Sequence, residues 1–297
     1  MSDFVQQQNN TCDFNSSDSW VILSPIEQSI KRKIEAVGTP LKDWDIQINY
    51  GIKTGFNDAF IISTEKRNEI LANCKDDDER KRTAELIRPI LRGRDIKRYC
   101  YVDNGLYLIN THNGVRGRIP RIKIEDYPAV KAHLDQYWDR IATRADKGDT
   151  PYNLRNCAYL EDFSRPKIIW KRIGSILRFS FDNKGCFGLD STCFAAGEHI
   201  EYLCCVLNSL MGHYLLKDSP KTGTGDLLVS VQAIEPARIP YNAQYDRQLS
   251  SLLGIQIANP SNATEKEIND IVFTMYGLSP KEREYVTQYV KRSQQSL

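Results

Sequence analysis

The stretch from Lys167 to Ala195 constrains the fold more than any other part of the chain. Its runs KIIWKRI, ILRFSFD and CFGLDSTCFA alternate with the period of two that is typical of strands, and Asn183-Lys184-Gly185 supplies a turn between the last two. Short strands joined by tight turns pair antiparallel. The segment therefore predicts a meander of short antiparallel strands.

Helical patterns stand on both sides of this meander. Ser24-Pro25-Ile26-Glu27 is a capping box with proline at the first helical position, and Gly38 is well placed to end the helix that it starts. Apolar spacing predicts further helices over 64–73, 78–91 (perturbed by Pro89), 128–145 and 198–216. Beyond Pro240 the chain is predicted to be helical to its end, with a second capping box at Ser279-Pro280-Lys281-Glu282.

Further strands are expected outside the meander. Trp44–Tyr50 alternates as a strand does, and a second strand covers Ala59–Ser63. The segment 99–110 reads as a hairpin around Asp103-Asn104-Gly105, and LLVSVQAI, residues 227–234, as a last strand. The predicted fold class is α/β, in the α+β sense: a mostly antiparallel curved sheet with flanking helices, followed by a small helical C-terminal segment.

Composition excludes several classes of protein. With 41% hydrophobic and 10% aromatic residues, the chain has enough apolar material for a core, which excludes disorder throughout. It has neither a 20-residue apolar run nor the features of a signal peptide, so we expect a soluble, cytoplasmic protein without a membrane partner. The eight cysteines form no CxxC pair, which fits reduced thiols.

Positive charge is concentrated in one part of the chain. Between Glu79 and Glu125 there are twelve basic and five acidic residues, a net +7, which leaves −5 for the rest of a chain whose total is +2. A basic block in a near-neutral protein points to an anionic partner, of which nucleic acid is the commonest. A solvated, ion-paired surface is the competing interpretation.

The residue patterns of common catalytic sites are missing. The four histidines are scattered, without HExxH or a zinc-ligand spacing, and no GxSxG elbow occurs. In Gly51-Ile52-Lys53-Thr54-Gly55 the lysine precedes the second glycine, so this is not a P-loop. Lys221-Thr222-Gly223-Thr224-Gly225 is more simply a flexible turn, and no GxGxxG follows a strand.

Six segments, in order, resemble the target-recognition region of fused restriction-modification enzymes. They are the run WVILSPIEQSIKRKIEAVGTPLKDWDIQINYGIKTGFNDAFIIS, then IRPILRGRDIKRY, RPKIIWKRI, LDSTCF, CCVLNSLMGHYLL and IVFTMYGLSPKE. The similarity is to the TaqI-like C-terminal specificity domain of type IIG restriction enzymes, and it runs from about Trp20 to Glu282. GIKTGFNDAF and LRGRDIKRY are its most specific parts.

The resemblance implies a specificity domain that recognises a sequence in double-stranded DNA. Enzymes of this family are adenine-specific DNA methyltransferases that use S-adenosylmethionine, and many also cleave DNA, for which Mg²⁺ is expected. The Asn/Asp-Pro-Pro-Tyr/Phe motif that holds a flipped adenine is absent here, since Asn259-Pro260-Ser261-Asn262 lacks the second proline and the aromatic residue. We therefore expect no catalytic residue, metal or cofactor in this chain, whereas its parent is expected to be the enzyme.

The resemblance also suggests a division of the chain. Residues 1–19 are expected to be a disordered leader, 20–45 a connector helix from a missing methyltransferase domain of the same polypeptide, 46–240 the target-recognition domain, and 241–297 a helical C-terminal segment. The tryptophans Trp20, Trp44, Trp138 and Trp170 lie in apolar contexts and are expected in the core rather than as stacking platforms.

The candidate DNA-binding residues supply cations for phosphates and polar groups for base edges. Lys97 and Arg98 are expected to bind phosphate, because Asp95 can pair with Arg92 or Arg94 for purely architectural reasons. Lys171 and Arg172 are neighbours on a strand and point to opposite faces, so at most one of them faces a given ligand. The full set is Lys53, Thr54, Asn57, Lys97, Arg98, Arg116, Arg118, Arg121, Lys171, Arg172, Arg178, Lys221 and Thr222.

Two other interpretations remain open at this point. A protein-interaction module could use the basic block to dock onto the catalytic domains of the same enzyme. The competing interpretation of the loop Lys53–Asn57 is a tight turn, and that of Asn113–Arg121 is a solvated loop, in both cases without a ligand. A standalone enzyme is disfavoured by the missing catalytic patterns.

Overall fold

A four-stranded antiparallel sheet, in the order β2-β10-β6-β8, forms the centre of the computed structural model, which describes residues 23–295. Three of its strands come from the predicted meander, which is thereby confirmed: β6 (Lys167–Lys171), β8 (Phe179–Asp182) and β10 (Thr192–Gly197). The fourth, β2 (Ile46–Tyr50), comes from the N-terminal part of the chain and pairs with β10.

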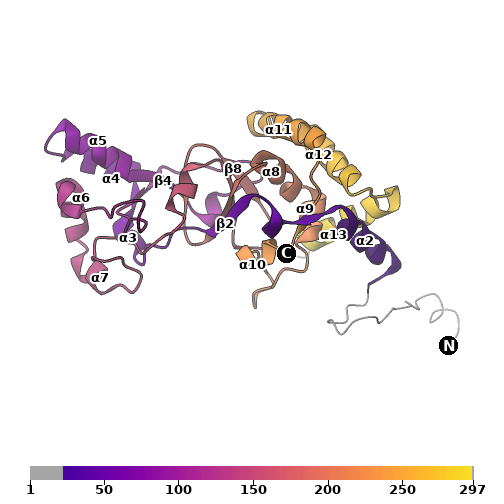
Figure 1. The fold of residues 1–297 in the computed structure, drawn as a ribbon, viewed down its shortest axis with the longest axis horizontal. Helices are drawn as coiled ribbons and strands as arrows, with labels where there is room; N and C mark the ends of the chain where they lie inside the picture. Colours follow the sequence, from indigo (N-terminus) through magenta and orange to yellow (C-terminus); the bar gives the residue numbers. More distant parts are fainter. Residues whose placement is uncertain (1–22, 296–297) are drawn as a thin grey trace.

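Both faces of this central sheet are buried. Ile168 and Trp170 lie in one hydrophobic core, whereas Ile169, between them in sequence, lies in another. The same alternation occurs on β10, since successive side chains of a strand point to opposite faces. The molecule is accordingly elongated, with one group of helices at each end of its long axis (Figure 1).

The first lobe contains a second four-stranded sheet, in the order β3-β5-β4-β9, in which only the β4–β9 pair is parallel. Its strands and helices are β3 (Ile61–Ser63), β4 (Ile87–Leu91), β5 (Leu106–Ile109), β9 (Phe187–Gly188), α3 (Asn57–Phe60), α4 (Thr64–Ala72), α5 (Asp77–Leu86), α6 (Pro128–Asp135) and α7 (Trp138–Thr143). Short 3-10 turns occur at Gly93–Asp95, Ile124–Asp126 and Leu160–Ser164.

The second lobe is mostly helical. It comprises α2 (Pro25–Val37), α8 (Ile200–Asn208), α9 (Leu210–Leu215), α10 (Val231–Ile234), α11 (Ala243–Ala258), α12 (Asn262–Met275) and α13 (Pro280–Gln295). Two two-stranded pairs join its loops, β1 (Thr39–Pro40) with β12 (Arg238–Ile239) and β7 (Ile173–Gly174) with β11 (Leu227–Leu228). A 3-10 turn, Leu41–Asp43, follows β1.

The predicted fold class is confirmed, with two differences in arrangement. The strands form two four-stranded sheets rather than one, and the C-terminal helices are not an appendage. Leu249 and Leu253 of α11 and Val272 of α12 lie in the same core as Trp170, so these helices complete the second lobe.

Several predicted elements are wrong in detail. The helix expected over 78–91 ends at Leu86 and continues as β4, because Pro89 cannot donate an N–H in a helix interior. The hairpin expected around Asp103-Asn104-Gly105 is also wrong: β5 pairs with β3 and β4 instead of folding back on the preceding residues. Tertiary pairing has overridden the turn signal there.

The two long helices predicted over 128–145 and 198–216 are each broken in the middle. The first divides into α6 and α7 around Gln136–Tyr137, and the second into α8 and α9 at Ser209. Ser209 caps α9 by accepting from the Gly212 N–H at 3.1 Å, so its hydroxyl starts a new helix. The last strand expected over 227–234 is limited to β11, and α10 follows it.

Some expectations concern individual residues. Trp170 is buried, and Trp44 packs against the same core, that of the second lobe. Trp138 is 44% exposed and belongs to neither core. The cysteines from Cys74 onward are free thiols. The leader 1–19, Cys12 and Trp20 lie outside the described residues. In the described chain, no helix is both long and apolar enough to cross a bilayer.

A buried ion pair fastens β6 to β8. Lys167 Nζ lies 2.5 Å from Asp182 Oδ2 and donates to Phe163 O at 2.6 Å, and both side chains are inaccessible to solvent. Asp182 also accepts from the Tyr101 hydroxyl at 3.0 Å and from the Cys186 N–H at 2.9 Å. Burial lowers the pKa of Lys167, which Asp182 opposes. The pair is therefore fully satisfied at a point where four segments meet.

A second polar contact joins α2 to α13. Glu282 accepts from Lys33 Nζ at 2.6 Å, from Ser29 Oγ at 2.8 Å and from the Ser279 N–H at 2.7 Å. Glu282 as a whole is 5% exposed. Burial alone would raise the pKa of Glu282, but these hydrogen bonds outweigh it and lower the pKa from 4.5 to about 2.

We predict that Lys167→Met destabilises the protein by about 3–5 kcal/mol, because it leaves a buried carboxylate without its counter-ion. Adding Asp182→Asn removes that charge, so the double variant should lose less than the sum of the single variants. Equilibrium urea unfolding measures both. Lys184→Met, at an exposed neighbouring lysine, is the control and should change stability by no more than about 0.5 kcal/mol. Additive losses would contradict the assignment.

We predict that Glu282→Gln lowers stability by about 1–3 kcal/mol at pH 6 and has little effect near pH 2. The pKa of Glu282 is depressed in the folded state, so its contribution is present above pH 4.5 and is lost as pH falls toward about 2. Urea unfolding of wild type and variant at pH 6, 4 and 2.5 measures the difference. A difference that does not change with pH would be evidence against an ionised Glu282.

Candidate nucleic-acid interface

The backbone that leads into the loop Lys53–Asn57 is pressed against the central sheet. The Gly51 N–H donates to Thr192 O at 2.9 Å. A Cβ on Gly51 would lie 1.9 Å from Leu189 O, so the chain can approach this closely only with glycine at this position. Packing within the fold therefore accounts for the first glycine of the GIKTGFNDAF motif.

Two of the candidate residues in this loop bond to each other. Thr54 is 1% exposed, and its hydroxyl donates to Asn57 Oδ1 at 2.6 Å while accepting from the Phe56 N–H at 3.2 Å. Gly55 has a φ of +73°, which turns the chain at this point. The Thr54 hydroxyl is thus used inside the loop, and Lys53 and Asn57 remain at the surface.

Arg144, which follows α7, binds the backbone of the loop Lys53–Asn57. Its guanidinium donates to the carbonyls of Thr54, Pro151 and Asn153 and stacks 4.3 Å from the centre of the Phe60 ring. Burial lowers the pKa of Arg144 to about 10, so the side chain remains charged at neutral pH. This arginine is an architectural residue that joins two loops.

Lys53 lies at the surface but is already paired with a carboxylate. Its Nζ lies 2.8 Å from Asp146 Oδ2, and Arg155 lies 3.2 Å from the other oxygen of the same carboxylate. The hydrogen bond from Lys53, together with the charges of Arg155 and Arg144, lowers the pKa of Asp146. One acidic residue therefore neutralises much of the positive charge at this loop.

In the LRGRDIKRY motif the charged side chains divide between structural and exposed roles. Arg92 binds the buried Asp95 with its Nε and Nη2 at 3.0 and 2.9 Å, and Asn104 donates to the same carboxylate. Burial would raise the pKa of Asp95, but Arg92 and Asn104 lower it overall. The architectural pair expected here is confirmed for Arg92, which leaves Arg94 exposed.

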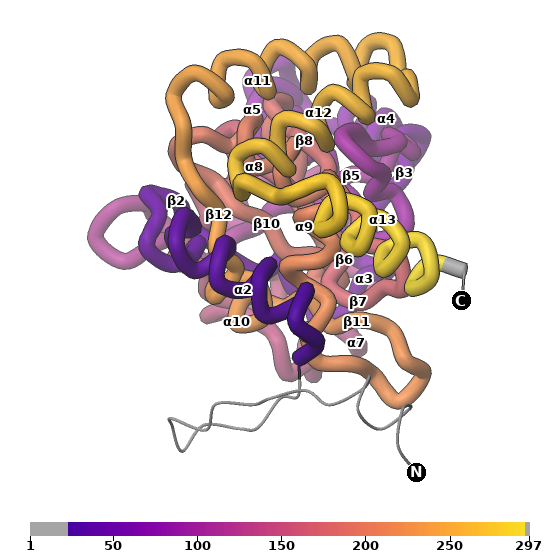
Figure 2. The backbone as a smooth tube through the Cα atoms, turned by 90° about the vertical axis from the view of Figure 1, so that its right-hand side faces the viewer, coloured from indigo at the N-terminus to yellow at the C-terminus, as the bar shows by residue number. Residues whose placement is uncertain are grey.

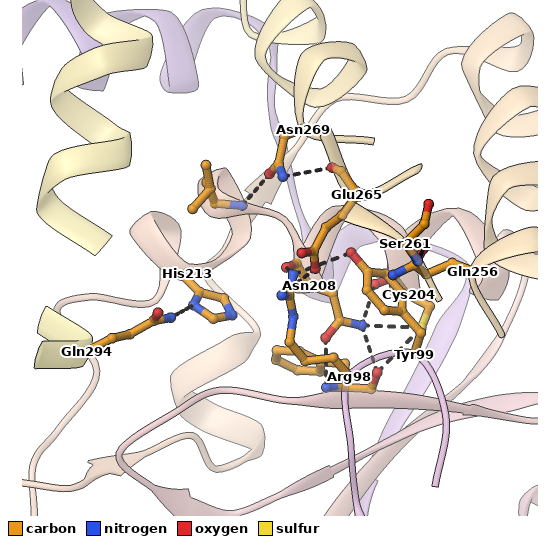
Figure 3. A network of polar contacts seen from close by, with 12 residues as sticks. Arg98, Tyr99, Cys204, Asn208, His213, Gln256, Ser261, Glu265, Asn269 and Gln294 are labelled. Atoms are coloured by element: carbon orange, nitrogen blue, oxygen red, sulfur yellow. Dashed lines mark hydrogen bonds and ion pairs between the residues drawn. The ribbon is translucent and has the colours of Figure 1, made fainter. Parts of the chain in front are cut away.

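Arg98 turns toward the second lobe instead of toward solvent (Figure 3). It donates to Asn208 O at 2.6 Å, forms an ion pair with Glu265 of α12, and lies over the Tyr99 ring. Asn208 in turn donates to Phe179 O and accepts from the Phe179 N–H. Arg98 therefore links the motif to β8 and α12.

Three cations form a row across the end of the central sheet, which we call the cation row: Lys171, Arg178 and Lys97. Trp170 pairs with Phe179, so the next positions outward, Lys171 and Arg178, face each other across β6 and β8. Tyr99 bridges Ser180 in parallel, and the Lys97 N–H donates to the Ser180 hydroxyl at 3.1 Å, so Lys97 lies at the edge of β8, beside Ser180 and hence two residues along that strand from Arg178. No carboxylate pairs with these three side chains among the described residues.

Two further cations lie beside the cation row. Lys97 Nζ donates to Arg94 O at 3.2 Å, and Gly93 packs on the stem of Lys171, since a Cβ there would lie 2.9 Å from Lys171 Cγ. Lys221 is exposed and bridges Leu227 of β11. Arg94 and Lys221 are also without a carboxylate partner in residues 23–295.

The other two candidates near the cation row are less accessible. Arg172 follows Lys171 and is half-buried, with a buried Nε that no described group accepts from. Thr222 is half-buried as well, and its hydroxyl bonds to Thr224 Oγ1 at 2.8 Å. Lys171 is exposed and Arg172 is half-buried, and that at most one of the two faces a given ligand stays a prediction.

The loop 113–121 has a fixed base and a free tip. Its base is held by a Val115–Ile119 bridge and by Asn113, which donates to Asp149 at 3.0 Å. Arg118 pairs with Glu161 at 2.9 Å, and Arg121 lies 3.5 Å from Asp149. Arg116, at the tip, is exposed and has no partner in the part of the chain that the structure describes.

The loop elements and the sheet end lie on one side of the molecule. Seen along the long axis, α3, α7, β7 and β11 gather on the same side, whereas α5 and α11 lie on the opposite side (Figure 2). Lys53 precedes α3, Lys171 precedes β7, and Lys221 precedes β11. The segments that carry Lys53, Lys171 and Lys221 therefore lie toward one side of the molecule.

Sequence reasoning missed Arg94, Arg144 and Glu265. Arg94 could have been found, because Asp95 can satisfy only one of its two flanking arginines in a bidentate pair. Glu265 and Arg144 carry no sequence signal, since Arg98 is far from Glu265 in the chain and Arg144 binds backbone carbonyls, which any residue supplies. Within residues 23–295, no three His, Cys, Asp or Glu side chains are placed to hold a metal ion.

Comparison with known proteins gives a likeness of fold. The structure of the type IIL restriction-modification enzyme MmeI in complex with DNA is similar with a TM-score of 0.59 and 10% identity, over 88% of this chain. The type IIG restriction endonuclease BpuSI has a TM-score of 0.43 and 13% identity, over 86% of this chain. The chain spans 37% and 34% of the lengths of those two proteins.

No family model and no curated protein matches the sequence. The likeness to MmeI therefore concerns the fold, which this chain shares with part of that enzyme.

We predict that Arg144→Met destabilises the protein by about 2–4 kcal/mol, because it removes a buried donor from three carbonyls and a cation from the Phe60 ring. The matched control is Arg155→Met, which removes an exposed arginine from the same loop and should cost less than about 1 kcal/mol. Thermal and urea unfolding measure both variants. Equal losses would exclude Arg144 as the residue that joins the two loops.

Proposed function

We propose that this chain is the specificity region of a restriction-modification enzyme and that it binds a short sequence in double-stranded DNA. The observation that carries the proposal is the cation row, which presents unpaired charge on a fold otherwise rich in internal ion pairs. Phosphate oxygens are the natural partners of such cations. The likeness to MmeI, which was solved in complex with DNA, supports the same partner.

The residues proposed to contact DNA divide into two groups. Lys97, Lys171 and Arg178, flanked by Arg94 and Lys221, bind the phosphate backbone. Arg116, at the tip of its loop, and Asn57 are placed to meet base edges, because both are exposed and carry the donors and acceptors that direct readout requires. Thr54, Arg98 and Arg172 are left out of the contact surface, since the fold uses or buries them.

The methyl transfer belongs in this proposal to another part of the polypeptide. The parent would be an adenine-specific DNA methyltransferase that uses S-adenosylmethionine, with Mg²⁺ required if it also cleaves DNA. No three metal-ligating side chains are grouped among residues 23–295, and the sequence contains neither a glycine-rich cofactor motif nor the Asn-Pro-Pro-aromatic motif for a flipped adenine. In this proposal, this chain determines the DNA sequence at which the parent enzyme acts.

The proposal is tested by selecting bound duplexes from a randomised library at two salt concentrations and sequencing them. An enriched short motif with salt-sensitive affinity is the expected result. Salt-sensitive binding without a motif would remove sequence recognition from the proposal. Absence of binding would favour the alternative, a module that docks onto the catalytic domains.

We predict that Lys171→Ala with Arg178→Ala weakens DNA binding roughly tenfold or more near 0.1 M salt. The slope of log affinity against log salt should fall by about 0.9 for each phosphate group that the variant no longer neutralises. Fluorescence anisotropy with a labelled duplex measures both quantities. The matched control is Lys81→Ala with Arg247→Ala, which removes the same charges from α5 and α11 on the opposite side. An equal loss in the control would contradict the assigned surface.

A further inference from the structure

We infer that Arg98 is a positioning residue, which holds Lys97 in the cation row by fastening its segment to the C-terminal helices. The inference rests on the proposed function. It gives Glu265 and Asn208 an indirect role in DNA binding: they hold Arg98 and do not contact DNA themselves. It replaces the expectation that Arg98 binds phosphate.

The segment that carries Lys97 needs such a fastening. Tyr99 has a φ of +67°, in the left-handed region that residues with a Cβ rarely adopt. In that conformation its N–H donates to Phe179 O at 2.9 Å and its carbonyl accepts from the Phe181 N–H at 3.0 Å. These two bonds attach the segment to the edge of β8, but they require a backbone that other contacts must stabilise.

Arg98 supplies the stabilising contacts from the neighbouring position. Its guanidinium reaches Asn208 O at the end of α8 and Glu265 on α12, and lies 5.3 Å from the centre of the Tyr99 ring. The side chain is only about one-third exposed, at 34%. Both terminal nitrogens have partners and the Nε is buried without one, so Arg98 has little left to offer a phosphate.

Further hydrogen bonds hold together the helices around the partners of Arg98 (Figure 3). Asn269 accepts from the Leu210 N–H at 2.7 Å and donates to Glu265 O at 2.8 Å, which ties α12 to the start of α9. His213 of α9 accepts from Gln294 of α13 at 3.3 Å. Burial and the charge of Arg98 lower the pKa of His213 to about 4, so this acceptor is neutral near pH 7.

The two roles of Arg98 predict opposite effects of Glu265→Gln. If Arg98 positions Lys97, weakening the ion pair loosens the segment, and DNA affinity falls roughly threefold to tenfold. If Arg98 were a phosphate contact held back by Glu265, the same change would release it and strengthen binding. Glu267→Gln, at an exposed acid on the same helix, is the control for the change in net charge.

A double-mutant cycle separates positioning from a general loss of structure. Arg98→Met should weaken DNA binding in the wild-type background and have little further effect when Lys97→Ala is present. In the Lys171→Ala background its effect should remain. An undiminished effect of Arg98→Met without Lys97 would overturn the inference.

Hydrogen exchange tests the fastening without DNA. Glu265→Gln should speed exchange of the Lys97 and Tyr99 amides, while amides of β10 keep their wild-type rates. Unchanged exchange at residues 97–99 would reject the positioning role. If wild-type protein shows this protection but binds no DNA, the proposed function fails and the structural link stands.

Discussion

The burial of the central sheet on both faces is the constraint on which the rest of the structure depends. A sheet with one face in solvent needs a covering layer on the other face only, whereas this sheet needs a layer of packed elements on each face. Ile169 and Phe194 require the first lobe on one face, and Ile168 and Trp170 require the α8 layer on the other. The elongated two-lobed shape follows from that requirement, and so does the position of the cation row at the end of the sheet.

The distribution of charge follows the same logic. Charges that lie inside the fold are matched: Lys167 with Asp182, Arg92 with Asp95, and Arg144 with carbonyl groups. Desolvation makes an unmatched charge costly there, and these partners offset that cost. Unmatched cations are tolerated where β6 and β8 reach solvent. A basic segment in the sequence is therefore a poor guide to a basic surface, because partners elsewhere in the chain neutralise much of it.

The elements that were predicted correctly are those whose structure depends on residues close by in the sequence. The capping box at Ser24 and the alternation from Lys167 onward specify their elements through contacts a few residues away, and both are present in the structure. The sequence could not show that 87–91 pairs as a strand or that Ser209 divides a helix, because these outcomes depend on neighbours from distant segments. The candidate site divides in the same way: the pairing of Asp95 with a flanking arginine is local, whereas the partner of Arg98 is Glu265, far along the chain.

The pairing of β2 with β10 has a consequence for how the chain is made. Ile46–Tyr50 leaves the ribosome long before Thr192–Gly197, and between them lie all the strands and helices of the first lobe. Such distant pairing is slow to form, because a long loop must close before any contact offsets its entropy. Until β10 is synthesised, β2 lacks its partner and part of the first core lacks Phe194. The nascent chain therefore carries an unpaired edge while residues 51–191 are synthesised, which is the interval in which a chaperone has most to protect.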